Sequence, residues 1–149
     1  MFDKAISYRA ADFCRGVAVR PIALSEDQAI LCLDGFIEED TDLSPAEKLK
    51  EGGLFVVRSS GGDIVPTLAL AKILHERRAV VVVYEQCLSS CANYLLIASD
   101  RSYVLKGALV AWDYESTDPA LPSCVKFTME KGARWRLPPA ARLLLALAS

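Results

Sequence analysis

Residues 79–84 read AVVVVY, an uninterrupted apolar run with four consecutive valines. β-Branched side chains favour strands, and six residues are far too few to cross a bilayer. A strand that is apolar on both faces needs cover on both faces, as a central strand of a parallel sheet has. The run therefore predicts an α/β domain with a buried, mostly parallel sheet.

Shorter apolar runs around this segment predict further strands, and amphipathic stretches between them predict helices. A helix capped by Ser44 is indicated by Pro45 at its first position and by Glu47 in the capping-box position. The alternation favours a parallel sheet with right-handed crossovers, within a single domain over residues 1–149. The expected strands are residues 28–37, 54–57, 79–84, 103–105 and 109–112, and the expected helices are residues 44–51, about fifteen residues after Gly62, and residues 90–99.

In the helix after Gly62, the residues Ile64, Leu68, Ala71 and Leu74 recur at helical spacing. This pattern predicts that the four side chains face the core.

The last part of the chain has a weaker pattern. Residues 123–134 are compatible with a helix, and Pro138–Pro139 predicts the start of a final helix that is apolar nearly all round. Such a helix must be buried or cover a partner subunit.

Composition narrows the choice of partners. Hydrophobic residues make up 52% of the chain, which is high for a soluble monomer, so we expect a homo-oligomer. A formal charge of -2 provides no field that attracts nucleic acid, and no apolar run reaches the roughly 20 residues of a membrane span. The N-terminal residues lack the apolar stretch of a signal peptide, which predicts a cytoplasmic protein as the chain stands and a periplasmic one if a signal peptide was removed.

The five cysteines lack the paired C-x-x-C spacing of a zinc site, so no metal is expected. They are expected to be reduced and mostly buried. Cys87 and Cys91 flank two serines, where a local disulfide would matter only in an oxidising compartment.

Two turns of small residues follow strands of the predicted sheet, namely Gly61–Gly62 and Ser89–Ser90. Helix N-termini at the ends of parallel strands offer unpaired N–H groups to an anion or an oxyanion. Taken alone, a glycine pair is more often a turn that needs positive φ, and a serine before a helix is more often its cap. Together they predict a hydroxyl beside free amides.

Four segments, in order, carry a resemblance to a known family. They read ILCLDGFI, FVVRSSGGDIVPTLALAKIL, VVVVYEQCLSSCANYLLIAS and SYVLKGALVAWDY. The chain resembles the ClpP-like serine peptidases of the ClpP/crotonase superfamily, especially a bacterial group with a C-x-S-[AS]-C-A motif. The resemblance implies an α/β fold of repeated ββα units with a mostly parallel sheet flanked by helices. It also implies a peptide or small acyl substrate and no cofactor.

By this resemblance, Ser89 is the nucleophile. The backbone N–H groups of Ser90 and Gly62, helped by Gly61, would form the oxyanion hole that stabilises the tetrahedral intermediate. Counting backward from the following helix places the nucleophile at Ser90 instead, so both serines are candidates.

The family's general base is a histidine, and Asp113 occupies that position here. A carboxylate with an ordinary pKa of about 3.9 accepts a proton less readily than an imidazole near 6.5, so burial would have to raise that pKa. His75, the single histidine, is expected at the surface. A lysine base would have to be Lys106, Lys126 or Lys131, each more typical of a solvated charge.

Three hypotheses follow from these residues. The first is a serine hydrolase in which Asp113 replaces the histidine, and the second is a catalytically inactive homologue that binds peptides or supports assembly. The third is an acyl-CoA enzyme, because crotonase-fold proteins share the two-amide oxyanion hole, although no sequence feature requires a CoA groove.

Overall fold

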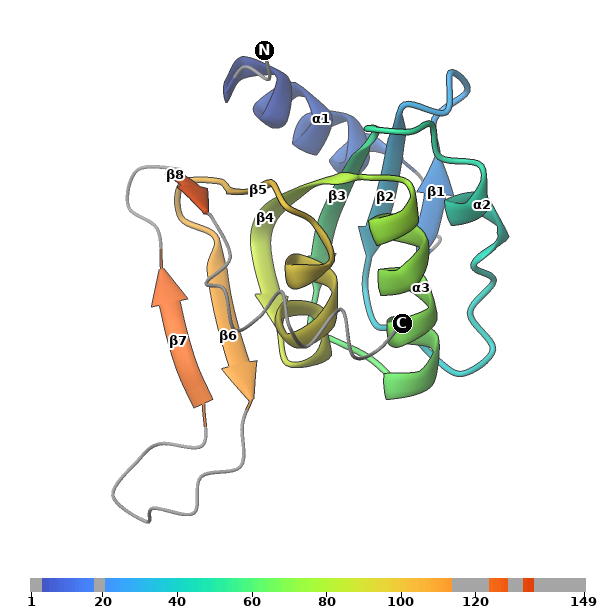
Figure 1. The fold of residues 1–149 in the computed structure, drawn as a ribbon. Helices are drawn as coiled ribbons and strands as arrows, with labels where there is room; N and C mark the ends of the chain where they lie inside the picture. Colours follow the sequence, from blue (N-terminus) through green and yellow to red (C-terminus); the bar gives the residue numbers. More distant parts are fainter. Residues whose placement is uncertain (1–3, 18–20, 114–123, 129–132, 136–149) are drawn as a thin grey trace.

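The protein is described by a computed structural model that covers residues 4–17, 21–113, 124–128 and 133–135. These residues form one eight-stranded sheet with helices on both faces (Figure 1). The strands are β1 (Ile22–Leu24), β2 (Ile30–Asp34), β3 (Leu54–Ser59), β4 (Val80–Leu88), β5 (Ser102–Val104), β6 (Leu109–Asp113), β7 (Cys124–Thr128) and β8 (Ala133–Trp135). The helical segments are α1 (Lys4–Gly16), α2 (Ser44–Glu47), α3 (Ile64–Glu76), η1 (Cys91–Leu95) and η2 (Leu96–Ala98).

The centre of the sheet is parallel. Strand β4 pairs in parallel with β3, β5 and β6, and β3 pairs in parallel with β2. The outer strands β1, β7 and β8 are antiparallel to their neighbours. The predicted α/β class, with a mostly parallel sheet flanked by helices, is therefore confirmed.

Strand β4 is buried on both faces, as its sequence predicts. Val81 and Val83 pack into the cluster that includes Leu70 of α3, whereas Val82 and Tyr84 pack on the other face, under α1. This alternation follows from the two-residue repeat of a strand. Helix α1 thus covers one face, and α2, α3, η1 and η2 cover the other (Figure 1).

The predicted core stripe of α3 is partly wrong. Ala71 and Leu74 are buried, but Ile64 is 56% exposed and Leu68 is 37% exposed. A polar residue takes the buried position instead, because the Thr67 hydroxyl donates a hydrogen bond to the Asp63 carbonyl at 2.7 Å and is thereby satisfied. The buried face of the helix is Pro66, Thr67, Leu70, Ala71 and Leu74.

The short helix α2 begins where the sequence places it but ends at Glu47 rather than at residue 51, and Ser44 is not its cap. Ser44 is the first helical residue, and both its N–H and its hydroxyl donate to the Asp42 carboxylate, at 2.9 and 3.0 Å. The Asp42 carboxylate therefore satisfies the N–H of the first helical residue, while the N-cap residue, Leu43, makes no side-chain cap bond.

The helix expected over residues 123–134 is also wrong, because this segment contains the strands β7 and β8. Val125, Phe127 and Thr128 belong to residue types that favour strands, and β7 pairs antiparallel with β6 over its whole length. The final helix expected after Pro138 lies outside the described residues.

The expectation of reduced cysteines is wrong for four of the five cysteines, which form two disulfides. Cys14 is bonded to Cys32, and Cys87 is bonded to Cys91. The first disulfide joins α1 to β2 across 18 residues of sequence, so spacing alone did not reveal it. The side chain of Cys124 lies outside the described residues.

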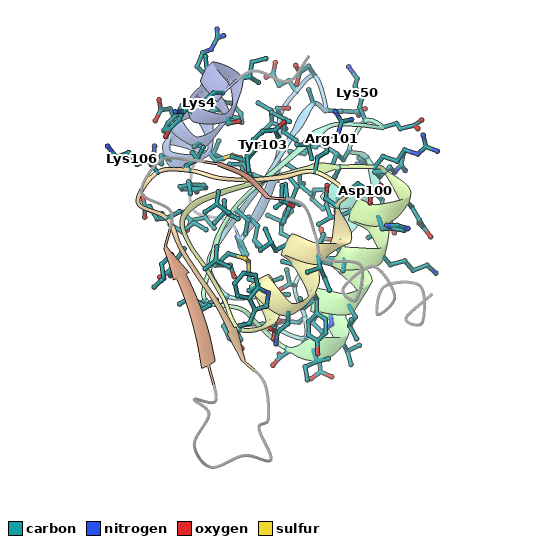
Figure 2. All side chains as sticks on the ribbon, turned by 60° about the vertical axis from the view of Figure 1, so that its left-hand side comes forward. Lys4, Lys50, Asp100, Arg101, Tyr103 and Lys106 are labelled. Atoms are coloured by element: carbon teal, nitrogen blue, oxygen red, sulfur yellow. A yellow bond between two sulfur atoms is a disulfide. The ribbon has the colours of Figure 1, made fainter. Side chains whose placement is uncertain are left out.

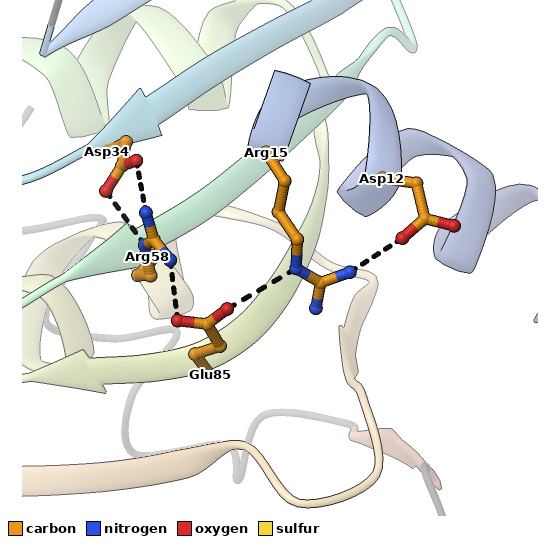
Figure 3. A network of polar contacts seen from close by, with 5 residues as sticks. All are labelled: Asp12, Arg15, Asp34, Arg58 and Glu85. Carbon is orange, nitrogen blue, oxygen red and sulfur yellow. Dashed lines mark hydrogen bonds and ion pairs between the residues drawn. The ribbon is translucent and has the colours of Figure 1, made fainter. Parts of the chain in front are cut away.

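A chain of ion pairs also ties α1 to the sheet (Figure 3). The Arg58 guanidinium binds both carboxylate oxygens of Asp34, at 2.9 and 2.5 Å, and reaches Glu85 at 2.6 Å. Glu85 also accepts a bond from Arg15 of α1 at 3.3 Å, and Arg15 binds Asp12 at 2.7 Å. Arg58, and to a lesser extent Arg15, hold the pKa of Glu85 below its usual value.

Candidate active site

The two predicted turns meet at one end of the parallel sheet. A Cβ atom placed on Gly61 would lie 3.0 Å from the Leu88 carbonyl oxygen, 3.2 Å from the Ser90 nitrogen and 3.3 Å from the Ser89 Cβ. Gly61 also has a φ of +112°, a conformation that residues with a side chain rarely adopt. Glycine at this position lets the loop with the two serines approach the backbone directly.

A bulge in β4 brings this loop to Gly61. Val57 of β3 pairs with Val83, but Ser59 pairs with Cys87, so β4 has two more residues than β3 between these pairs. Glu85, within the bulge, has a φ of 63°. Before the bulge β4 pairs with β5, and after it β4 pairs with β6. Bulges commonly redirect a strand in this way beside functional sites.

The glycine turn is held on its far side by Ser59 and Ile37. The buried Ser59 hydroxyl accepts a bond from the Gly61 N–H at 3.0 Å and donates to the Gly35 carbonyl at 2.6 Å. Ile37 donates to the Gly61 carbonyl at 3.1 Å, and its own carbonyl accepts from Asp63 at 2.8 Å.

These bonds leave the backbone of Gly62 directed toward the serine loop, because alternate residues of an extended chain point their N–H and C=O groups to opposite sides. The Gly62 carbonyl accepts the Ser90 hydroxyl at 2.9 Å. Within the described residues, no backbone hydrogen bond engages the Gly62 N–H. This amide is available to an oxyanion.

Ser89 occupies the strained position of the loop. Its φ is 52°, and it is half-buried. A non-glycine residue in this region costs about 1–3 kcal/mol, and such residues concentrate at active sites. The Ser89 N–H donates to the Ala111 carbonyl of β6 at 2.9 Å, and its carbonyl accepts from Asn93 at 2.8 Å, so the backbone is fixed on both sides.

The two candidate nucleophiles have different surroundings. Ser90 is 7% exposed, and its hydroxyl is committed to the Gly62 carbonyl. The Ser89 hydroxyl has no hydrogen-bond partner among the described residues. The geometry therefore favours Ser89 over Ser90.

A disulfide closes the loop that holds both serines. Cys87 ends the β4 side of the loop, Cys91 begins η1, and both are fully buried. The helix expected at residues 90–99 is present but irregular, with a π-helical turn followed by a 3₁₀ turn. Such irregular turns are frequent at functional sites.

Asp113 ends β6, the strand that binds Ser89. It follows Ala111 by two residues, and Ala111 is both the register partner of Leu88 and the acceptor of the Ser89 N–H. The backbone thus brings Asp113 to the strand beside the serine loop. Its side chain lies outside the described residues.

The alternative bases lie elsewhere or outside the described residues. His75 is exposed on α3, with Nδ1 3.3 Å from the Ala98 carbonyl, in a surface cavity that Asp100 and Arg101 also line. Lys106 follows β5 on the side of the molecule where α1 lies, and its N–H donates to the Tyr8 hydroxyl at 3.3 Å (Figure 2). The Lys126 side chain and all of Lys131 lie outside the described residues.

Sequence reasoning missed an exposed apolar surface beside Gly62. Val65 is 78% exposed and Phe36 is 49% exposed, and the apolar side chains of Ile64 and Leu68 are exposed as well. Phe36 also lines a cavity of about 500 Å³ with acidic residues around it. The cavity is lined by Pro21, Ile22, Phe36, Glu38, Asp40, Thr41, Asp42 and Pro45. The signal in the sequence is a phenylalanine two residues after a strand end, at the start of an acidic segment.

The described residues contain no group of three or more His, Cys, Asp or Glu side chains placed to hold a metal ion. In the same residues, no helix combines the length and the apolar character that a membrane crossing requires. No protein-family model matches this chain, and no curated protein matches it either.

Proposed function

We propose that this chain is a ClpP-like serine hydrolase with the ClpP/crotonase fold, acting on a peptide or a small acyl substrate. The observation that carries the proposal is the contact between Gly61 and the loop of Ser89 and Ser90. It puts Ser89, whose hydroxyl has no partner among the described residues, beside the Gly62 amide. The succession of parallel strands and crossover helices supports the fold assignment.

In the proposed reaction, the Ser89 hydroxyl oxygen attacks the substrate carbonyl carbon. The N–H groups of Gly62 and Ser90 stabilise the oxyanion that forms, and each such donor contributes about 3 kcal/mol to lowering the barrier. The leaving group departs with a proton, and water then hydrolyses the acyl-enzyme.

The proton from Ser89 passes to Asp113 in this proposal. An aspartate is a weaker base than a histidine, because its ordinary pKa is about 3.9 rather than about 6.5. Slow turnover is therefore expected, and covalent labelling of the serine is a better assay than hydrolysis.

The test compares three proteins with a fluorophosphonate probe. The wild type is expected to gain one covalent label detected by mass spectrometry, and Ser89→Ala is expected to gain none. Ser90→Ala should still be labelled at Ser89, because in the structure its hydroxyl only binds the Gly62 carbonyl. A wild type that stays unlabelled from about pH 5 to 9 would refute the hydrolase, since a competent serine must react within this range.

A second candidate is a catalytically inactive homologue that forms a homo-oligomer or binds peptides. The exposed apolar side chains of Phe36, Ile64, Val65 and Leu68 favour this candidate, because large apolar side chains left exposed to solvent often mark an interface.

The oligomer can be tested at its most exposed apolar residue. Val65→Asp should convert a sedimenting oligomer to a monomer, because it would place a charge in a desolvated interface. Lys72→Asp, a change at an exposed position further along α3, is the matched control and should leave the sedimentation coefficient unchanged. A monomeric wild type, or a Val65→Asp variant that keeps its oligomeric state, would contradict an interface at this surface.

A further inference from the structure

The loop from Cys87 to Cys91 is closed by its own disulfide, and the two serines lie inside it. Ser89 and Ser90 occupy the middle of this five-residue loop, and the sulfur atoms are buried beneath it. The disulfide thus joins the end of β4 to the first residue of η1 at the point where the proposed nucleophile stands.

The conformation of the loop needs support from its surroundings. Ser89 is held at a φ of 52°, which an unconstrained serine disfavours. Two hydrogen bonds fix the loop from outside, one from the Ser89 N–H to Ala111 and one from the Ser90 hydroxyl to Gly62. The disulfide restrains the same residues from inside the loop, because it joins residues only four positions apart.

A small displacement of this loop would affect both parts of the site. The Ser90 nitrogen would lie only 3.2 Å from a Cβ at Gly61, so the position of the loop sets the spacing of the two proposed oxyanion donors. The same loop carries the nucleophile. Errors of about 1 Å in such positions can lower a rate by about 10²-fold.

We infer that Cys87 and Cys91 are positioning residues, and that the serine site becomes reactive only after the two cysteines have been oxidised to the disulfide. This inference rests on the proposed function. In the step, two cysteine thiols lose two protons and two electrons, one S–S bond forms, and a disulfide oxidant is reduced to two thiols. The oxidant is a small-molecule or protein disulfide.

Because both cysteines are buried, their oxidation to the disulfide must take place as the protein matures, before the fold is complete. Cys87 and Cys91 are both fully buried in the folded protein, so a thiol can attack their bond only when the loop opens. The disulfide forms before or during folding and then persists.

The chain offers a matched control in its other disulfide. Cys14–Cys32 fastens α1 to β2 on the opposite side of the sheet from η1, and neither cysteine belongs to the serine loop (Figure 1). Removal of either disulfide costs stability, but only removal of Cys87–Cys91 should change the geometry of the serine.

The experiment compares Cys87→Ala/Cys91→Ala with Cys14→Ala/Cys32→Ala at a temperature where circular dichroism shows both variants folded. The rate of fluorophosphonate labelling at Ser89 is expected to fall by about 10²-fold in the first variant and by less than about twofold in the second. Wild type refolded without an oxidant should react as slowly as the first variant, whereas wild type refolded in the presence of oxidised glutathione should react at its full rate. Equal labelling rates in the wild type and the first variant would overturn the inference.

A second measurement does not depend on reactivity. Amide hydrogen exchange across residues 86–95 should be about tenfold faster in Cys87→Ala/Cys91→Ala than in the wild type, because the Ser89 N–H loses its fixed position beside Ala111. The Cys14→Ala/Cys32→Ala variant should exchange here as the wild type does. If the wild type is never labelled but this difference appears, the hydrolase is refuted while the positioning role stands. Unchanged exchange in the first variant would refute the positioning role.

Discussion

Gly62→Ala is expected both to destabilise the fold and to slow serine labelling strongly. A Cβ at this position would lie 2.4 Å from the Ile37 carbonyl oxygen, 2.6 Å from the Ile37 Cβ and 2.8 Å from the Ile37 nitrogen. Two of these three atoms belong to the backbone, and Ile37 is fully buried, so no flexible side chain can move aside. The new methyl group must push the segments of Ile37 and Gly62 apart.

The expected cost combines overpacking with broken hydrogen bonds. Inserting a methyl group into a packed site costs about 1–3 kcal/mol. Separation of the strands also loses the bonds from Ile37 to Gly61 and from Asp63 to Ile37, at about 1 kcal/mol each. The sum is about 4 kcal/mol, which lowers the thermal midpoint of a chain this long by about 10 °C.

Labelling should fall because the Gly62 amide moves with the strand. Loss of one oxyanion donor lowers turnover by about 10²–10³-fold. Gly16→Ala is the control, because a Cβ there meets no atom within 4 Å. Thermal unfolding and fluorophosphonate labelling of both variants check the prediction. A Gly62→Ala variant with the midpoint and labelling rate of the wild type would show that the turn is not packed as described.

The parallel strands could be predicted because their signal is local. Residues 79–84 must be buried on both faces, and each face is covered, by α3 on one side and α1 on the other. Helix α1 itself was missed because its buried face consists of small side chains with little hydrophobic contrast. The buried residues are Ser7 and the residues three, four and seven positions after it, namely Ala10, Ala11 and Cys14.

The predictions from sequence were wrong where contacts between distant parts of the chain decide the local structure. Strand β7 exists because it pairs with β6, a partner that the pattern of residues 123–134 does not reveal. Which face of α3 is buried depends on Thr67, because its hydroxyl is satisfied by a hydrogen bond to the Asp63 carbonyl and can therefore lie in the core. The bond between Cys14 and Cys32 requires two elements to meet, and no spacing in the sequence encodes that meeting.

For the candidate site, the sequence predicted that two turns belong together, and the structure places them in contact. It could not choose between the two serines. That choice depends on which hydroxyl the backbone binds, and the Gly62 carbonyl binds Ser90. The positive φ of Ser89 and the bulge at Glu85 are likewise properties of the folded backbone.

Asp113→His is expected to raise the labelling rate of Ser89 by about 10²–10⁴-fold, the contribution typical of a positioned general base. The last residue of β6 is already beside the serine loop, because Ala111, two residues earlier, binds the Ser89 N–H. An imidazole with a pKa near 6.5 is neutral and basic at pH 7.5, whereas a carboxylate with a pKa near 3.9 holds a proton only weakly. The gain should therefore appear as the pH rises through about 6.5 and disappear below about 5.

The controls separate this gain from a general effect of an added histidine. Asp100→His introduces the same side chain at an exposed position away from the serine loop and should leave the labelling rate unchanged. Asp113→His combined with Ser89→Ala should not be labelled, because the nucleophile is gone. A folded Asp113→His variant that reacts no faster than the wild type would mean that the oxyanion donors are not arranged for acyl transfer. That result would count against both the active hydrolase and a homologue that lost only its base, because each requires an intact oxyanion hole beside Ser89.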